Sequence, residues 1–270
     1  MIVKRIFSKA LSVKNNMYWK KSAKKLRKET VSLGVEKPGE GKIIILMPHS
    51  DDEWIGCSQL IIHRSHNILV LNLDMCGGDD EYTHSVRRHE AITVSNMYHY
   101  ELKLASNPIE DLIRTIVDYS PDFIFLPCYF DWHEEHIRVM NAFMSAADTV
   151  GFSGKVGMYQ VSLPIPDEII NCGFPMSHKT WKEKWKLFKS YYPTQCFIPS
   201  TRFAIQEYIN GPLANSYATE VYSIFEYGDW KQLFIHNQLD CEERQYYKQK
   251  LNDIHEIKSK ARIIKAKNIG

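Results

Sequence analysis

The sequence contains no apolar run long enough to cross a bilayer and no secretory signal pattern. A spanning helix needs about 20 mostly apolar residues, and a signal peptide needs an apolar core ahead of a small-residue cleavage site. We therefore expect a cytoplasmic protein. The cysteines lie far apart, with no Cys-x-x-Cys pair, so free thiols are expected. Two of them, Cys76 and Cys128, follow predicted strands, where they are either small buried residues or neighbours of a site.

Motifs for two common ligand classes are also missing. No Gly-x-Gly-x-x-Gly follows the first predicted strand, which argues against a dinucleotide site. The basic residues gather in a terminal arm without a recognised nucleic-acid module, which argues against binding to nucleic acid. No internal repeat stands out. At 270 residues and 44% hydrophobic, the chain can bury one sizeable core.

Short apolar runs alternate with helical stretches along the first part of the chain. Such alternation implies right-handed crossovers and parallel strand pairing. The sequence therefore predicts an α/β fold, a Rossmann-like and mostly parallel sheet with helices on both faces, plus a C-terminal extension that completes the pocket. Strands are expected at residues 43–47, 68–73, 101–104, 123–126 and 158–162, and helices at 58–63, 80–97, 109–118 and 134–147.

One imidazole and three carboxylates follow the first of these strands. Residues 43–47 are fully apolar, as in a strand buried on both faces, and Pro48 ends the run. His49 then lies just beyond the carboxyl end of the strand, where open α/β sheets bind ligands. His49 and Asp52 are three residues apart and can point the same way as the next helix begins. Acidic clusters such as Asp51-Asp52-Glu53 are also common in the first turn of a helix, where they only interact favourably with the helix dipole.

A second cluster follows another buried strand, about eighty residues later. It reads Asp131-Trp-His-Glu-Glu-His136, and its two histidines have the i, i+3 spacing that places them on one helical face. A lone His-x-x-His is often only a surface or capping pair. Because both clusters follow apolar strands, one sheet edge would receive His49, Asp52 and His136. Three nitrogen or oxygen ligands with an open fourth position is the pattern of catalytic zinc, and two histidines with one carboxylate also suit ferrous iron.

These motifs resemble those of the PIG-L/LmbE family of zinc-dependent N-acetylglucosaminyl deacetylases. The family's first motif, roughly Ala/Pro-His-Pro-Asp-Asp-Glu, corresponds to residues 48–53, with Ser50 in place of proline. Its second, Asp-x-His-x-x-His, corresponds to residues 131–136, and its Arg-x-x-Glu to residues 87–90. Thr194-Gln195 and, with an insertion, residues 217–221 resemble later motifs, whereas the loop at residues 74–78 departs from the family's Thr-x-Gly. The resemblance implies a deacetylase-like domain over residues 41–227.

The resemblance also implies roles for the individual residues. His49, Asp52 and His136 would bind the metal, and Asp51 would act as general base. Zinc lowers the pKa of a bound water to about 7, so an aspartate that a helix N-terminus and a dication keep ionised can serve as that base. His133, in its protonated form, would stabilise the oxyanion or protonate the leaving amine. Asp131 would orient His133, with a helix N-cap as the alternative.

Three further residues are assigned less directly. The resemblance implies that Arg87 holds the substrate, although its polar surroundings also fit a solvated helix face. Trp132, beside His133, is a candidate for substrate contact. Glu53 would either pair with a basic group or cap its helix, and the sequence does not decide.

The two ends of the chain differ from its middle. Residues 1–40 hold 11 Lys or Arg against three Glu, a net charge of +8, which leaves −6 for the rest of a chain whose formal net charge is +2. This basic arm or helix would lie on an anionic membrane surface, pack on the catalytic domain or stay disordered. Its apolar side would consist of Ile2, Ile6, Phe7, Ala10, Val13 and Met17. Residues 228–270 are expected to be a helical extension, with one charged helix over 239–266.

The sequence thus predicts a metal-dependent hydrolase that removes acetyl from an N-acetylated amino sugar, with zinc or ferrous iron as cofactor. Its partner would be a small-molecule or glycan substrate, such as an N-acetylglucosamine conjugate, with peripheral contact to the inner face of the membrane as one option. The sugar comes from the resemblance alone. The alternatives are a hydrolase of another acyl amide or ester, and a catalytically idle sugar-binding or scaffold protein on the same fold.

Overall fold

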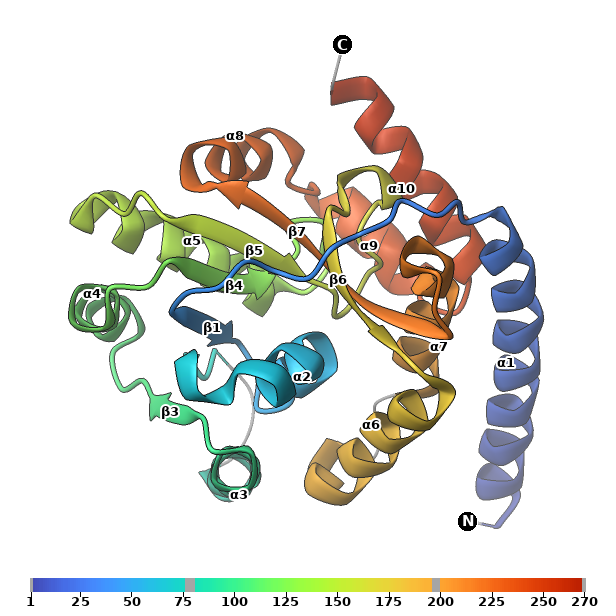
Figure 1. The fold of residues 1–270 in the computed structure, drawn as a ribbon. Coiled ribbons are helices and arrows are strands. Elements are labelled where there is room, and N and C mark those ends of the chain that lie inside the picture. The colour runs from blue at the N-terminus through green and yellow to red at the C-terminus, as the bar shows by residue number, and fades with distance from the viewer. Residues whose placement is uncertain (1, 76–80, 196–199, 269–270) are drawn as a thin grey trace.

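A seven-stranded sheet with helices on both faces forms the centre of the protein (Figure 1). The computed structural model describes residues 2–75, 81–195 and 200–268. The strand order is β3-β2-β1-β4-β5-β7-β6, in which β1 to β5 pair in parallel and β7 runs antiparallel to both of its neighbours. The predicted mostly parallel α/β architecture is confirmed. The strands are β1 Ile43–Met47, β2 Ile68–Asn72, β3 Glu101–Leu104, β4 Phe123–Pro127, β5 Lys155–Tyr159, β6 Cys172–Met176 and β7 Ala218–Glu226.

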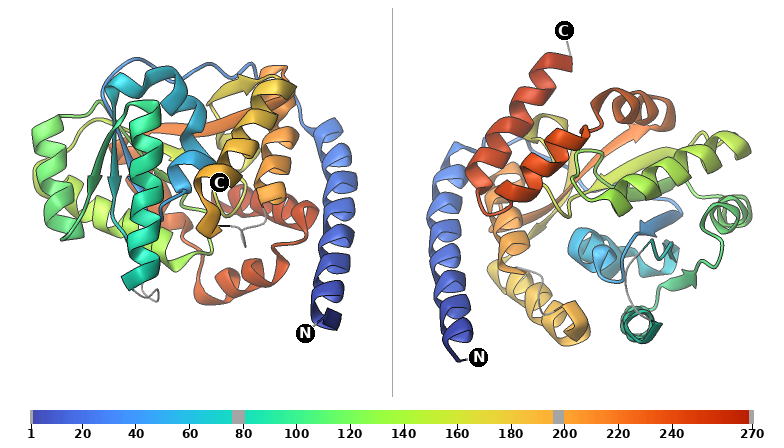
Figure 2. Two further views of the ribbon diagram at one scale, coloured as in Figure 1. Left: turned by 90° about the horizontal axis from the view of Figure 1, so that it is seen from below. Right: turned by 180° about the vertical axis from the view of Figure 1, so that it is seen from behind.

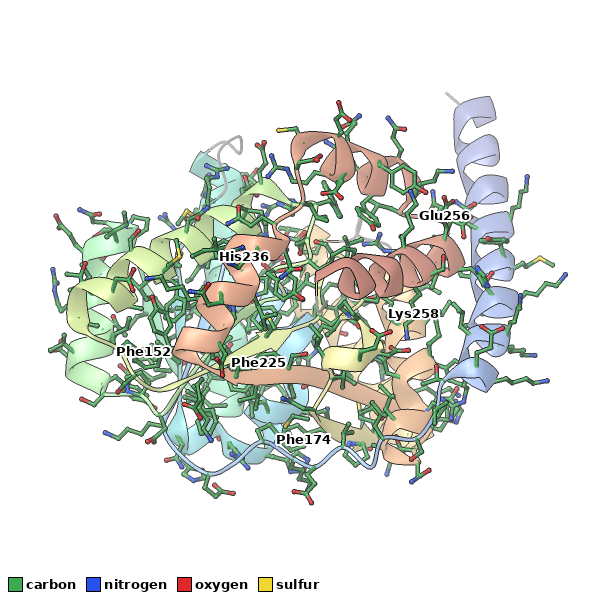
Figure 3. All side chains as sticks on the ribbon, turned by 90° about the horizontal axis from the view of Figure 1, so that it is seen from above. Phe152, Phe174, Phe225, His236, Glu256 and Lys258 are labelled. Atoms are coloured by element: carbon green, nitrogen blue, oxygen red, sulfur yellow. The ribbon has the colours of Figure 1, made fainter. Side chains whose placement is uncertain are left out.

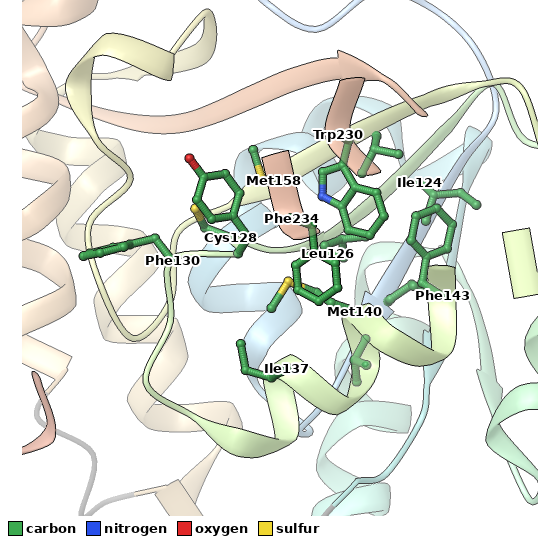
Figure 4. Close-up of a cluster of buried hydrophobic side chains, with 14 of the residues drawn as sticks. Ile124, Leu126, Cys128, Phe130, Ile137, Met140, Phe143, Met158, Trp230 and Phe234 are labelled. Carbon is green, nitrogen blue, oxygen red and sulfur yellow. The ribbon is translucent and has the colours of Figure 1, made fainter. Parts of the chain in front are cut away.

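Two separate apolar clusters cover the two faces of the sheet. Successive side chains of a strand point to opposite faces, so Ile44 and Leu46 of β1 enter one cluster while Ile43 and Ile45 enter the other. Figure 4 shows the first cluster, in which β4 packs against α5 and α8 and which also contains the buried Cys128. The ten helices of the described chain are α1 Ile2–Glu29, α2 Asp52–Arg64, α3 Glu81–Tyr98, α4 Pro108–Tyr119, α5 Glu134–Val150, α6 His178–Tyr191, α7 Ser200–Asn210, α8 Tyr227–Asn237, α9 Cys241–Lys250 and α10 Ile254–Asn268.

Three strands at one side of the sheet differ from the sequence prediction. β5 begins at Lys155, three residues before the predicted start, because Gly157 belongs to the strand and not to a turn. A Cβ at Gly157 would lie 2.5 Å from the ring of Phe125 on β4, so the ring occupies the space that a side chain would need. β6 and β7 were not predicted. β6 contains Pro175, which is tolerated because β6 is an edge strand, and the buried Glu220 interrupts the apolar pattern of β7.

Helix α2, which follows β1, is kinked at Cys57, where the backbone is non-helical (φ −133°, ψ 18°). The carboxylate of Glu220 on β7 lies at this kink. Its Oε1 accepts hydrogen bonds from the backbone N–H of Gln59 (2.8 Å) and Leu60 (3.4 Å), and its Oε2 accepts one from Ser58 Oγ (2.8 Å). Glu220 therefore caps the second half of α2 in the way that an acidic residue caps a helix N-terminus.

The basic N-terminal segment is helical and packs on the domain. Helix α1 runs along the outside of the molecule beside α7 and α10 in both views of Figure 2. Trp19, Ala23 and Leu26 are buried against α7 and α10, and Arg27 donates hydrogen bonds to backbone carbonyls of Tyr208, Ser216 and Tyr217. Packing is confirmed for this half of α1. The predicted apolar stripe lies mostly outside the described side chains, and its one described member, Met17, is exposed.

The charged C-terminal segment forms two helices, so the prediction of one helix over 239–266 was wrong. The chain turns at 251–253, where Asp253 Oδ1 accepts the N–H of Glu256 (3.1 Å) and thereby caps α10. Lys258 of α10, labelled in Figure 3, is buried and donates to Asp167 Oδ1 (2.6 Å). No helix in the described parts of the chain is both long and apolar enough to span a bilayer.

Candidate metal centre

The two predicted ligand motifs meet at one edge of the sheet. β1 and β4 are neighbours and run in parallel, so their carboxyl ends lie side by side. His49 and Asp52 follow β1, and His136 lies in the first turn of α5, which follows β4. The backbone N–H of His49 donates to Asp52 Oδ2 (3.0 Å), which fixes the turn between β1 and α2. Asp52 and His136 are almost fully buried.

Three donor atoms of these residues form a small triangle. His49 Nδ1 lies 3.0 Å from Asp52 Oδ2 and 3.3 Å from His136 Nε2, and His136 Nε2 lies 3.5 Å from Asp52 Oδ2. Ligands of a tetrahedral zinc ion with bonds of about 2.0–2.1 Å are separated by about 3.3 Å. The triangle therefore fits zinc without rearrangement. Ligand atoms of His49, His133 and His136 also lie within 4.8 Å of one another, so His133 borders the same point.

Both imidazoles of the triangle are held by a carboxylate on the nitrogen that points away from it. His136 Nδ1 lies 2.7 Å from Asp131 Oδ2, and His49 Nε2 makes a short hydrogen bond to Glu135 Oε2. Carboxylates in this position fix the tautomer and ring orientation of metal-binding histidines. Glu135 was missed by the sequence reasoning, although its place between two histidines of one motif was a usable signal.

The structure corrects the expected partner of Asp131. Its side chain orients the ring of His136 and not that of His133, from which it accepts only the backbone N–H (2.9 Å, to Oδ1). It is also not the N-cap of α5, a position that His133 occupies without a side-chain hydrogen bond.

Removing the negative charge of Asp131 should weaken metal binding. We expect Asp131→Asn to lower zinc affinity by about 10- to 100-fold, because His136 loses the carboxylate that holds its ring. Competition with a fluorescent zinc chelator measures the change, and Asp118→Asn, an exposed change of the same charge, serves as the control. Equal affinities for Asp131→Asn and wild type would show that Asp131 does not support the ligand.

The charged groups of the triangle stabilise one another. Burial works against charge on His49, but Asp52 and Glu135 raise its pKa to about 9, and Asp131 and Asp52 raise the pKa of the buried His136 to about 10. Burial also opposes ionisation of Asp52, yet these two imidazoles hold its pKa well below the ordinary value. The site is thus an ion-pair cluster. A dication would bind to the same donor atoms in place of the imidazole protons.

Asp51 and His133 flank the triangle, and burial shifts the pKa of each side chain toward its neutral form. Burial and the neighbouring Asp52 raise the pKa of Asp51 well above its ordinary value, against the lowering effect of His49 and Arg87. The helix N-terminus alone therefore does not keep Asp51 ionised. Burial, His136 and His49 lower the pKa of His133 to about 4, which disfavours the expected imidazolium. Asp51 Oδ2 and His133 Nδ1 are buried and have no hydrogen-bond partner among the described residues.

The surroundings of Glu53 differ from both sequence readings. It is fully buried and accepts hydrogen bonds from the hydroxyls of Tyr192 (2.5 Å) and Tyr100 (3.3 Å), and burial raises its pKa to about 7. It neither pairs with a basic group in these contacts nor caps α2. Two phenol donors take the place of the expected cation.

The remaining predicted residues lie around the centre. Arg87 is half-buried on α3, close enough for its charge to lower the pKa of Asp51, which places it toward the site. On the same helix Glu90 accepts the backbone N–H of Thr194 (2.9 Å). The Arg-x-x-Glu motif therefore contacts the Thr194-Gln195 motif. The ring of Trp132 lies 4.9 Å from that of His133. Cys76 lies outside the described residues. Cys128 is buried in the first apolar cluster, as expected for a small buried residue.

Comparison with solved structures supports the resemblance at the level of the fold. The N,N'-diacetylchitobiose deacetylase from Pyrococcus horikoshii matches with a TM-score of 0.53 and 16% identity, over 75% of this chain and 89% of that one. The conserved protein TT1542 from Thermus thermophilus matches with a TM-score of 0.53 and 14% identity, over 68% and 94%. A deacetylase of the teicoplanin biosynthetic pathway matches with a TM-score of 0.51 and 12% identity, over 70% and 99%.

At the level of sequence no family model and no curated protein matches the chain. The two histidine motifs pointed to the PIG-L/LmbE family, and the solved structures that this chain resembles include deacetylases of that fold. The chain therefore shares the fold of the PIG-L/LmbE deacetylases.

Proposed function

We propose that this protein is a metal-dependent hydrolase that removes the acetyl group from an N-acetylated amino sugar. The observation that carries the proposal is the triangle of His49, Asp52 and His136, with each imidazole backed by a carboxylate. A merely structural ion-pair cluster does not need donors spaced for a tetrahedral cation. The shared fold with deacetylases of N-acetylated sugars supports the substrate class.

The residues around the triangle divide the work of amide hydrolysis. When bound, zinc or ferrous iron would supply a Lewis acid that acidifies water and polarises the amide carbonyl. Asp51, next in sequence to Asp52, would accept the proton of the attacking water, and a dication held by the triangle would lower its raised pKa. The same proton can then pass to the departing nitrogen, so that water and amide give acetic acid and amine, which leave as acetate and ammonium at neutral pH.

In this proposal His133 stabilises the oxyanion in its neutral form. Because its pKa is lowered to about 4, it enters the reaction as a neutral imidazole. A neutral imidazole still carries one N–H, which can donate to the carbonyl oxygen as negative charge develops there. We assign contact with the sugar to Arg87, whose charge lowers the pKa of Asp51, and to Trp132, whose ring lies 4.9 Å from that of His133.

Metal removal tests the proposed reaction. Purified protein is stripped with a chelator, reloaded with zinc or ferrous iron, and assayed for acetate release from a panel of N-acetylated amino sugars. We expect release only after reloading, and the better of the two metals identifies the cofactor. Release from other acyl amides or esters, but not from the sugars, would point to a different hydrolase. No release from any compound with metal bound would favour a sugar-binding or scaffold protein.

A further inference from the structure

A cavity of about 370 Å³ opens beside the metal centre, between the start of α5 and helix α9. On the α5 side it is lined by Trp132, His133 and Glu135, the last of which contacts His49 directly. On the other side it is lined by Arg244 and Lys248 of the C-terminal extension. Its volume is in the range of small-ligand sites, which is roughly 300–1,000 Å³. A substrate held at the triangle could therefore extend into it.

Three cationic side chains line this cavity, and one of them, Arg138, is paired with Glu135 (3.4 Å). Arg244 and Lys248 are one helical turn apart and share a face of α9. Across the described residues, neither makes an ion pair with a carboxylate: the contact of Arg244 is with Cys241 Sγ (3.2 Å), and Lys248 Nζ lies 5.6 Å above the ring of Trp132. Lys250 of the same helix, which lies outside the cavity, is paired with Glu256 (3.3 Å).

The carboxylates that line the cavity do not neutralise this pair. Glu135 is engaged by His49 and by Arg138 (3.4 Å), and Glu134 is exposed to solvent. Trp132 also lines this cavity, but its indole Nε1 is buried and is not open to a ligand there. Among the described residues, Arg244 and Lys248 thus line the cavity without a paired carboxylate, next to the residues that would bind the metal.

We propose that the amino-sugar substrate carries a phosphate or diphosphate, and that Arg244 and Lys248 bind this group. The inference rests on the proposed deacetylase function and specifies its substrate. A neutral sugar has no need of two cations, whereas guanidinium and ammonium groups are the usual donors to phosphate. The C-terminal helix therefore selects the substrate, and the two histidine motifs act on it.

A matched pair of substrates tests the proposal. N-acetylglucosamine 1-phosphate and methyl N-acetylglucosaminide are compared on zinc-loaded wild type and on Arg244→Gln/Lys248→Gln. We expect the double variant to raise KM for the phosphorylated sugar by about 10- to 100-fold, the worth of one or two charged hydrogen bonds. Its kcat and its KM for the neutral glycoside should stay unchanged. The control Lys186→Gln/Lys189→Gln removes two exposed charges from α6 and should change neither KM.

Calorimetry provides a readout that does not need turnover. Both sugars are titrated into zinc-loaded protein, together with a uridine diphosphate sugar and an N-acetylated sugar that carries a carboxylate. Tighter binding of the phosphorylated sugars, lost in the double variant, supports the proposal, and the stronger of the two distinguishes phosphate from diphosphate. Equal affinity for the neutral, carboxylated and phosphorylated sugars, or an unchanged preference in the double variant, would overturn it. Phosphate-dependent binding without acetate release would instead count against the deacetylase function alone.

Discussion

Asp51→Asn should lower kcat for acetate release by about 10²- to 10⁴-fold, the usual contribution of a general base, and should leave the bound metal in place. The amide keeps the size of the side chain but cannot accept a proton from water. Asp51 belongs to none of the three contacts that define the donor triangle. Zinc content measured by atomic absorption, together with steady-state acetate release, separates loss of the base from loss of the metal.

Asp52→Asn is the matched control, because it makes the same chemical change one residue later. Asp52 Oδ2 touches both ligand imidazoles, so this variant should lose zinc as well as activity. If Asp51→Asn and wild type released acetate at the same background rate with zinc bound, the protein would be a binding relic of the fold. If Asp51→Asn retained full activity above that background, another group would be the base.

The second large effect is on stability, and it concerns Lys184 of α6. Its Nζ is fully buried and donates to Ile55 O (2.7 Å), to Glu220 Oε2 (2.7 Å) and to Glu207 Oε1. Burial opposes the charge, but the two carboxylates raise its pKa, so it stays protonated. Lys184→Met should cost about 3–5 kcal/mol of unfolding free energy, because two buried carboxylates then lose their cation.

Urea unfolding followed by circular dichroism measures this loss. Lys186→Met is the control, since Lys186 is exposed on the same helix and its replacement should change stability by less than about 0.5 kcal/mol. Adding Glu207→Gln to Lys184→Met should recover part of the loss, because one uncompensated charge is removed. A Lys184→Met protein as stable as the control would show that the buried cluster is not held by its cation.

The first four strands and the helices between them were predicted from the sequence, although α2 begins at Asp52 and not at residue 58, and in β1, β2 and β4 the apolar pattern agrees with full burial. β1 and β4 are continuous apolar runs ended by Pro48 and Pro127, and both are buried on both faces as such runs require. β6 and β7 were not predicted because their sequences contain residues that are uncommon in strands. Pro175 is allowed only by the edge position of β6, and Glu220 only by Lys184 and the kink of α2. Both reasons are tertiary and cannot be read from a single segment.

The candidate site was predictable where spacing and topology decide the outcome. His49, Asp52 and His136 meet because two parallel strands end at one edge, which the sequence pattern implies. The contacts around these three residues could not be predicted from the sequence. Which imidazole Asp131 would orient depends on side-chain rotation, and the two hydroxyls that surround Glu53 come from Tyr100 and Tyr192, far away in the chain. The charge states of Asp51 and His133 follow from burial, which only the folded structure reveals.

The anchoring of α2 by Glu220 has a consequence for the order in which the protein matures during synthesis. Glu220 is translated 162 residues after Ser58, so a nascent chain can present both histidine motifs while the helix that bears Asp52 still lacks its interior cap. Metal captured by such a chain would meet a loosened set of ligands. Tight loading is therefore expected only after β7 has left the ribosome and joined the sheet.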